Sequence, residues 1–361
     1  MTELAAPSPT ANKIVGKYTV AASVRSRKPP LALGDVTSGI VRQTDPASYT
    51  IPGMIEGRRQ LWVGGYGPEH SSHGRGLARF RDVVEEESAR EIEVRVTWNI
   101  MDEGRRNTDL FDLVESGEMF MCYFSSSYLG PRVPQLNVLE VPFLFDDLAS
   151  AHRALDGDLG QKMAEAVRAA TGFELLGMWD NGFRHFTNRL RPVRSPSDCV
   201  GMTVRVQPNP IHESLFRAWG AIPKAMDLNR GIEAISSGEV DAQENPLANT
   251  VAYGVDRVHR FVTMTGHLYG ARGLWANRNR METLPADVAD LVRRAAREAI
   301  VQQRKDAAEG EKQLRRRLEE QGVEFVDLGG VERQEFIAAS RQVIDEAIAS
   351  LPDDMSEWVS R

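Results

Sequence analysis

From Leu61 onward, short apolar runs alternate with stretches of helical periodicity, and this alternation limits the fold more than any other feature of the chain. Strands that alternate with helices are typical of βαβ units, in which the strands lie parallel. The first elements expected are a strand, a helix, a strand, a helix and a strand over residues 61–66, 75–89, 91–99, 107–116 and 119–124. The sequence therefore predicts an α/β protein with mostly parallel sheets.

The second half of the chain continues the alternation and adds one unusually long helix. Further helices are expected over about 148–170, 229–237 and 331–350, and strands over the apolar runs 173–179, 183–187, 202–207, 221–226, 261–269 and 323–328. The long helical stretch begins near Pro285, a residue suited to a first turn, and ends at Gly322. Because it exceeds an ordinary globular helix, we expect it to bridge two lobes or to kink.

A chain of 361 residues is long enough for about two domains. We expect an amino-terminal lobe over 61–181 plus 271–310 and a carboxyl-terminal lobe over 182–270 plus 311–361, with the chain crossings as the hinge. Residues 1–60 are rich in Pro, Ala, Ser and Thr, which predicts a disordered extension. They lack the basic start and uninterrupted apolar stretch of a secretory leader.

Charge and cysteine content exclude several classes of protein. The formal net charge is −7 with acids and bases interspersed, so nucleic acid has no electrostatic reason to bind. No run approaches the roughly 18 apolar residues that span a bilayer. Cys122 and Cys199 are too few for a disulfide framework, and we interpret them as buried free thiols, with a single bridge as the alternative.

Motifs for metal, nucleotide or nucleophilic chemistry are not evident. His70 and His73 have a spacing compatible with metal but no acid or thiol companion beside them. Asp241 and Glu244 lie three apart beside a turn, where carboxylates more often accept hydrogen bonds than act as an acid–base pair. Phosphate loops and a nucleophile elbow are absent. We therefore expect no cofactor, no metal and no catalytic residue.

Three short segments, 182–188, 201–210 and 238–249, contain polar residues that core packing does not explain. Arg184 and Arg205 each lie between apolar residues on an expected strand, where an unpaired guanidinium would be costly to bury. A guanidinium presents a planar fork of donors that matches a carboxylate bidentately. Because ligands of open α/β sheets collect at the carboxyl ends of strands, Arg205 is the principal candidate for a ligand contact.

The same segments resemble a known family, the solute-binding receptors of tripartite ATP-independent periplasmic (TRAP) transporters of the dicarboxylate-receptor type. The resemblance covers roughly residues 61–350. It rests on motifs that occur in order: PFLF at 142–145, GFRHFTN at 182–188, VRVQPNP at 204–210, WGAIPKAM at 219–226, VDAQENP at 240–246 and TGHLYG at 265–270.

The resemblance implies a two-lobed, monomeric periplasmic receptor that closes around an organic acid and delivers it to small and large membrane subunits. It implies that Arg205 clamps the carboxylate, that Arg184 contacts or orients the ligand, and that Asn245 is a polar contact of the pocket. Glu244 would support that pocket, and His267 is a further candidate for the cleft. A satisfied histidine at the end of a strand is an equal alternative for His267.

This chain departs from the family pattern at two places. Residues 228–232 read Leu-Asn-Arg-Gly-Ile where many members have an aromatic residue followed by Ser-Glu-Val-Tyr. Leu228 and Arg230 therefore become candidates for a reshaped pocket wall. In the amino lobe, Arg105 and Arg106 stand where a Gly-rich turn is usual, and either is a candidate for a second anionic group of the ligand.

Structural roles are alternatives to the ligand-binding roles given to the two arginines. Arg205 is open to neutralisation by Glu244, and Arg184 to neutralisation by Asp180, in purely structural ion pairs. The missing leader and the altered segment 228–232 favour a second function, a cytoplasmic enzyme or sensor acting on an organic acid on the same scaffold. The sequence does not choose among the organic acids.

Overall fold

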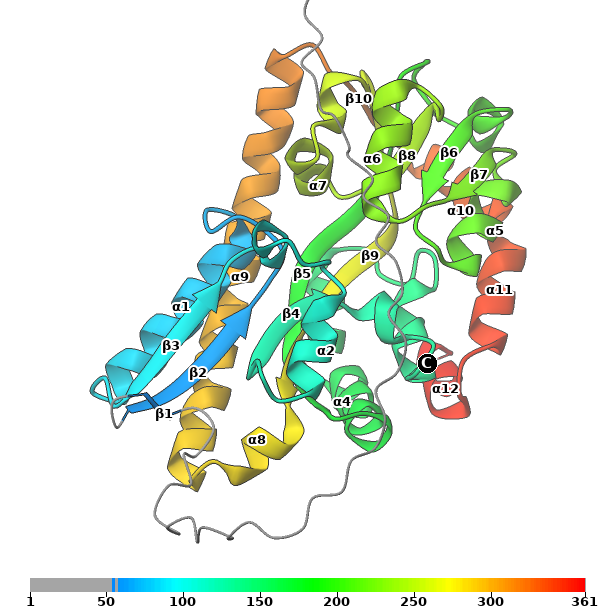
Figure 1. Ribbon diagram of the computed structural model, residues 1–361. Helices are drawn as coiled ribbons and strands as arrows, with labels where there is room; N and C mark the ends of the chain where they lie inside the picture. Colours follow the sequence, from blue (N-terminus) through cyan, green and yellow to red (C-terminus); the bar gives the residue numbers. More distant parts are fainter. Residues whose placement is uncertain (1–53, 56–57, 361) are drawn as a thin grey trace, which may run out of the picture. The chain divides into compact units, whose positions relative to one another are not determined.

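The computed structural model describes residues 54–55 and 58–360, which form one sheet covered by helices (Figure 1). The strands are β1 Met54–Ile55, β2 Arg58–Gly64, β3 Ile92–Thr97, β4 Met121–Ser125, β5 Phe173–Asn188, β6 Thr203–Val206, β7 Ile222–Ala225, β8 Ala242–Asn245, β9 Phe261–Asn277 and β10 Glu324–Asp327. The predicted extension, residues 1–60, lies largely outside the described residues. Its last described residues belong to β1 and to β2, which begins three residues before the expected strand.

The helices agree in order with the predicted alternation. They are α1 Ser72–Glu87, α2 Asp109–Glu115, α3 Leu148–Leu155, α4 Asp158–Ala170, α5 Pro210–Ala218, α6 Leu228–Ser237, α7 Leu247–Ala252, α8 Arg278–Thr283, α9 Ala286–Glu320, α10 Gly330–Ala339, α11 Arg341–Ala349 and α12 Asp353–Val359. Short 3₁₀ helices lie at η1 Ile100–Glu103, η2 Ser126–Leu129, η3 Pro134–Glu140, η4 Pro196–Cys199 and η5 Val255–Arg257. The single helices expected over 148–170 and 331–350 are each divided in two, at Gly157 and at Ser340.

The ten described strands follow the order β1-β2-β4-β9-β5-β8-β6-β7, with β3 beside β2 and β10 beside β9. The pairs β2–β3, β2–β4, β6–β7, β6–β8 and β9–β10 are parallel, as the βαβ pattern predicts. The pairs β1–β2, β4–β9, β5–β9 and β5–β8 are antiparallel. The sheet is therefore mixed, and the expectation of mostly parallel pairing is wrong for the long strands β5 and β9, whose pairs with β4, β8 and each other are all antiparallel.

The centre of the sheet is a long antiparallel ribbon of β5 and β9 (Figure 1). The runs 173–179 and 183–187 were expected as separate strands, but they belong to one strand of 16 residues. Gly182, with φ of 98°, lies opposite Gly270, and the register shifts between Asp180 and Gly182. The polar residues and the glycine at 180–182 are typical of a turn, but the strand continues through them as a bulge.

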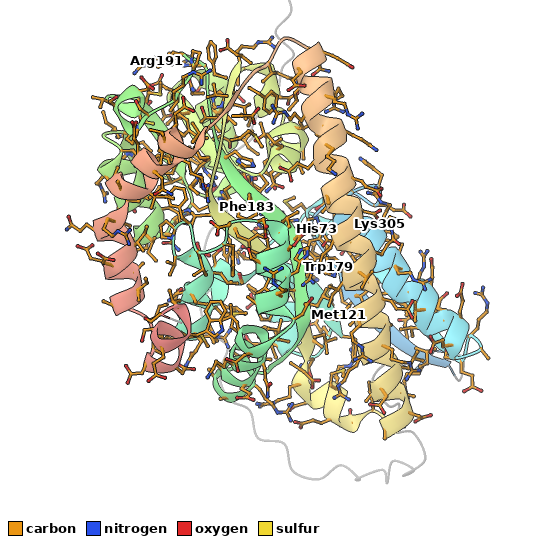
Figure 2. All side chains as sticks on the ribbon, turned by 180° about the vertical axis from the view of Figure 1, so that it is seen from behind. His73, Met121, Trp179, Phe183, Arg191 and Lys305 are labelled. Atoms are coloured by element: carbon orange, nitrogen blue, oxygen red, sulfur yellow. The ribbon has the colours of Figure 1, made fainter. Side chains whose placement is uncertain are left out.

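Helix α9 has 35 residues and packs on α1, on β5 and on α7. It therefore connects elements at both ends of the central ribbon, as expected of a bridging helix. Seen from behind (Figure 2), α9 runs beside α1, with His73 of α1 and Trp179 of β5 close by; their ring centroids are 5.9 Å apart. Pro285 precedes the first helical residue of α9, as its fixed φ favours.

Separate hydrophobic cores lie at the two ends of the ribbon. One end has a core between β4, η3 and α4 and another between β2, β4, α1 and α9. The other end has a core centred on β6 and α5, with smaller clusters under α6 and under α7. These cores, joined by β5, β9 and α9, correspond to the two-lobed α/β fold that was predicted.

Two further expectations concern the cysteines and the membrane. Cys122 and Cys199 are both buried free thiols, which confirms their interpretation. Burial raises the pKa of both thiols, that of Cys199 to about 12, so neither is a reactive thiolate near neutral pH. Among the described helices, none combines the length and the apolarity required to cross a bilayer.

Candidate functional site

Arg205 lies on β6 with the buried residues Val204 and Val206 on either side. Its side chain is 3% exposed, and Nη2 donates to the carbonyl oxygen of Met226 at 2.9 Å. Within residues 58–360 its Nε has no hydrogen-bond partner and no carboxylate forms an ion pair with it. The charged group is thus removed from water without an anion from the described part of the protein.

Helix α6 packs on β6 and holds Arg205 in place through a glycine. The Asp227 side chain caps this helix by accepting from the backbone N–H of Arg230 at 2.9 Å. In the next position, a Cβ atom built on Gly231 would lie 2.5 Å from Nε of Arg205 and 3.1 Å from its Cδ. Gly231 is therefore what allows the helix and the arginine side chain to come this close.

Glu244 on β8 neutralises Arg184 on β5. Oε1 of Glu244 accepts from Nη2 of Arg184 at 2.7 Å, Oε2 accepts from Nε, and the carbonyl oxygen of Glu244 accepts from Nη2 at 2.9 Å. The Arg184 side chain is 5% exposed and that of Glu244 is 0%. Glu244 therefore pairs with Arg184 and forms no ion pair with Arg205, although its charge partly opposes the lowering of the pKa of Arg205 by burial.

Asp180 does not neutralise Arg184, so this second structural alternative is wrong. Asp180 instead lies 2.8 Å from Nε2 of His152 and accepts a hydrogen bond from the hydroxyl of Tyr269. The partner of Arg184 comes from a strand 60 residues away, because β8 pairs antiparallel with β5 and places Glu244 opposite Phe186.

Two histidines extend this buried pair into a network. His212 lies 2.7 Å from Glu140 through Nε2 and 3.5 Å from Glu244 through Nδ1, and His267 lies 3.5 Å from Glu244. Burial alone would lower the pKa of His212, but Glu140 and Glu244 raise it to about 9. Burial raises the pKa of a carboxyl, yet Arg184 and the histidines hold that of Glu244 well below its usual range. Burial lowers the pKa of His267 to about 4, so its ring is neutral near pH 7.

Amide side chains continue from β8 into α7. Asn245, 3% exposed, donates toward Gln243 at 3.5 Å and accepts from Nδ2 of Asn249 at 3.0 Å. The same Nδ2 lies 3.3 Å from Oδ1 of Asn181 on β5. Because Gln243 is the register partner of Arg205, Asn245 lies two residues farther along the strand that neighbours β6. The structure therefore brings Arg205 and Asn245 to one region of the sheet.

A third buried arginine, Arg272 on β9, was not predicted. Its residue exposure is 5%, and its guanidinium lies over the rings of Tyr66 at 4.7 Å and Tyr123 at 5.7 Å. Nη2 is 3.5 Å from Oδ1 of Asn249, and Nε has no partner among the described residues. The sequence signal was available, since Arg272 also stands alone in an apolar strand, Tyr-Gly-Ala-Arg-Gly-Leu-Trp.

The remaining candidates form no hydrogen bond with these three arginines. Arg230 is exposed and pairs with Glu239, and Arg106 is exposed and pairs with Asp109 at 2.9 Å. Arg105 is exposed, and Leu228 is half-buried at the start of α6. His267 is fully buried between Phe216 and Trp219, where its Nδ1 lies 2.7 Å from the hydroxyl of Thr265. His267 thus lies within β9 in the core of the lobe, and its Nε2 has no hydrogen-bond partner among the described residues.

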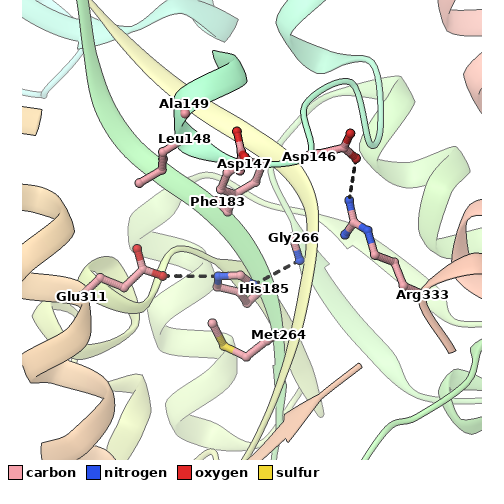
Figure 3. A pocket seen from close by; sticks show the side chains of 10 residues that line it. All are labelled: Asp146, Asp147, Leu148, Ala149, Phe183, His185, Met264, Gly266, Glu311 and Arg333. Atoms are coloured by element: carbon pink, nitrogen blue, oxygen red, sulfur yellow. Dashed lines mark hydrogen bonds and ion pairs between the residues drawn. The ribbon is translucent and has the colours of Figure 1, made fainter. Parts of the chain in front are cut away.

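One pocket, of about 520 Å³, lies at the crossing of β5, β9 and α9 (Figure 3). Phe183, His185, Gly266 and Glu311 line it, together with Asp146–Ala149, Met264 and Arg333. His185 lies 3.5 Å from Glu311 there and accepts from the backbone N–H of Gly266. Arg184 stands between Phe183 and His185 in sequence but is turned to Glu244, because successive strand side chains point to opposite faces. The pocket therefore differs from the site around Arg205.

Comparisons with known proteins agree with this arrangement. The family model described as bacterial extracellular solute-binding protein, family 7 (DctP) matches residues 63–351. A solute-binding protein of Verminephrobacter eiseniae is 30% identical over 75% of this chain and 79% of its own length. The 2,3-diketo-L-gulonate-binding periplasmic protein YiaO of Escherichia coli is 28% identical over 76% of this chain and 82% of its own.

A solved structure leads to the same family. The sugar acid binding protein DctPAm of Advenella mimigardefordensis, in complex with galactonate, superimposes with a TM-score of 0.77 at 26% identity, over 84% of this chain and 96% of that one. The fold, the ordered motifs and the match over residues 63–351 converge: the chain belongs to the family 7 bacterial extracellular solute-binding proteins, the DctP family of TRAP transporters.

Proposed function

We propose that this protein captures a small organic acid by its carboxylate, with Arg205 as the clamp and Asn245 as a neighbouring polar contact, and passes it to the membrane subunits of a TRAP transporter. The observation that carries the proposal is the buried guanidinium of Arg205 without a carboxylate partner among residues 58–360. The named relatives bind 2,3-diketo-L-gulonate and galactonate, both organic acids.

The energetics of Arg205 favour an anionic ligand. Taking a guanidinium out of water costs several kcal/mol, and one hydrogen bond to a carbonyl oxygen offsets only a part of that, about 1.5–3 kcal/mol. A bidentate carboxylate would supply two further charge-assisted hydrogen bonds and a full opposite charge. Arg184 has already obtained such a partner in Glu244, and we therefore assign it to orienting the site through that pair.

Export and delivery follow from membership of the family. We place the working protein in the periplasm, with the small and large membrane subunits of the transporter as its partners. The matched family and the named relatives consist of receptors and not of enzymes. We accordingly propose that the bound acid leaves the protein chemically unchanged, which mass spectrometry of the acid before and after binding would check.

Calorimetric titration of the purified protein with galactonate, glucuronate and succinate tests the clamp. Loss of two charge-assisted bonds predicts that Arg205→Ala weakens binding of whichever acid binds by at least about tenfold. The matched control is Arg230→Ala, which removes an exposed arginine of the adjoining helix that pairs with Glu239. Arg205→Lys should recover binding only in part, because an ammonium lacks the planar fork. Equal affinity of Arg205→Ala and the wild type would refute the assignment.

A further inference from the structure

We propose that Arg272 forms a second anion subsite, so that the preferred ligand is an acid with two anionic groups, such as a dicarboxylate. This inference rests on the proposed function, because it places the first anionic group at Arg205. Proteins similar to this chain bind acids of both kinds: galactonate and 2,3-diketo-L-gulonate carry one carboxylate, whereas a protein of Rhodobacter capsulatus binds C4-dicarboxylates, and Arg272 assigns this chain to the second kind.

The first argument is the incomplete environment of Arg272. The residue is 95% removed from solvent, its Nε is unpartnered, and Nη2 reaches only an amide oxygen at 3.5 Å. No Asp or Glu of the described chain pairs with it. Contacts with two aromatic faces are worth less than the several kcal/mol that desolvating a guanidinium costs. The described residues therefore supply no anion to neutralise the buried guanidinium of Arg272.

Neighbouring side chains do not supply the negative charge. Burial raises the pKa of both phenols beneath the guanidinium, that of Tyr123 to about 12, so Tyr66 and Tyr123 are neutral near pH 7. His73, stacked on Tyr123, is fully buried and its pKa is held well below the usual range, so it adds no positive charge that would repel an anion. The cluster is thus a single cation set on neutral aromatic rings.

The second argument is the connection between Arg272 and the Arg205 site. Asn249 accepts from Arg272 and donates to Asn245, which is itself linked to Gln243, the register partner of Arg205. Three amide side chains therefore lead from one unpaired guanidinium to the strand that neighbours the other. Such a polar run suits an extended acid with acceptor groups between two anionic ends.

Two other arginines show what a purely structural role looks like in this fold. Arg184 has both carboxylate oxygens of Glu244. Arg280 lies over the ring of Phe120 at 5.3 Å, as Arg272 lies over Tyr66, but it is half-buried and donates to the carbonyl oxygens of Gly117 and Gln60. Arg272 has neither the carboxylate of the one nor the carbonyl oxygens of the other.

The test uses acids that share a carbon skeleton and differ by one carboxylate: galactarate against galactonate, and succinate against butyrate. Calorimetry on the wild-type protein should give at least about tenfold tighter binding for the dianion of the pair that binds. Arg272→Gln should reduce the affinity for the dianion to within about threefold of that for the monoanion and leave the monoanion unchanged. Arg280→Gln, the matched control, should keep the preference.

Each outcome decides between the two proposals. Equal binding of dianion and monoanion by the wild type, or a preference that survives Arg272→Gln, overturns the second subsite while the Arg205 clamp stands. Binding that is insensitive to Arg205→Ala overturns the clamp, and the inference built on it. Failure of all four acids to bind the wild type counts against both. Circular dichroism and the melting temperature of unliganded Arg272→Gln, with Arg272→Lys as a second variant, exclude loss of fold as the cause.

Discussion

Replacing Glu244 with Gln tests whether the buried ion pair sustains the carboxyl-terminal lobe. The substitution keeps the shape of the side chain but leaves Arg184, which is 4% exposed, without its carboxylate. Breaking a buried pair on one side costs about 3–5 kcal/mol, because the remaining charge stays buried and unpaired. For a chain of this size that corresponds to a melting temperature lower by roughly 4–8 °C.

Urea unfolding followed by tryptophan fluorescence is a suitable assay, because Trp219 is buried beside His267 within the same lobe. The matched control is Glu239→Gln, which removes the carboxylate of the exposed pair with Arg230 and should not change the unfolding midpoint measurably. A midpoint for Glu244→Gln equal to that of the control would refute the reasoning. It would mean that Arg184 reaches water or another acid without Glu244.

Two further predictions concern residues around the same strands. The pKa of His212 in the folded protein, about 9, lies above the 6.5 of an unperturbed histidine, so its contribution to stability is complete below about pH 6.5 and is lost as the pH rises toward 9. Between pH 6.5 and 9 the unfolding free energy of the wild type should therefore fall by at most about 3 kcal/mol, and urea titrations of His212→Gln should not show this fall. A pH profile of the variant equal to that of the wild type would contradict the role of His212. Gly231→Ala should weaken binding of galactonate or succinate in calorimetry by displacing the guanidinium of Arg205, and the same overpacking should lower the melting temperature despite the better helix propensity of Ala. Unchanged affinity would show that Arg205 can shift without loss.

The sequence predicts well what depends on local pattern. The order of the expected elements, the bridging helix after Pro285 and the burial of Arg205 were correct, although two expected strands form the single strand β5 and two expected helices are each divided. The pairing of strands that lie far apart in the sequence could not be predicted. That Arg184 needs an acid follows from its apolar strand, but the choice of Glu244 over Asp180 depends on how β8 pairs with β5.

Arg272 and the central ribbon escaped prediction for related reasons. Arg272 shows the same signal as Arg205, an arginine alone in an apolar strand, but the rings that receive it belong to Tyr66 and Tyr123, on segments remote in sequence. The ribbon is interrupted by Asp180, Asn181 and Gly182, which resemble a turn, and only pairing with β9 keeps the chain extended there. Both features arise from tertiary contacts that local propensity does not contain.

The buried arginines Arg184, Arg205 and Arg272 divide into two groups. Arg184, His212, Glu244 and Glu140 form a network of two cations and two carboxylates that requires nothing from outside.

Arg205 and Arg272 add two positive charges that the described residues leave without a carboxylate. Folding already removes these two guanidiniums from water and fixes their positions. An acid that binds them as proposed is therefore attracted by both charges without the cost of ordering the two side chains. Any ligand that binds only the folded protein stabilises it by about 2.7 kcal/mol at a hundred times its dissociation constant, so a thermal shift with an acid would report this binding.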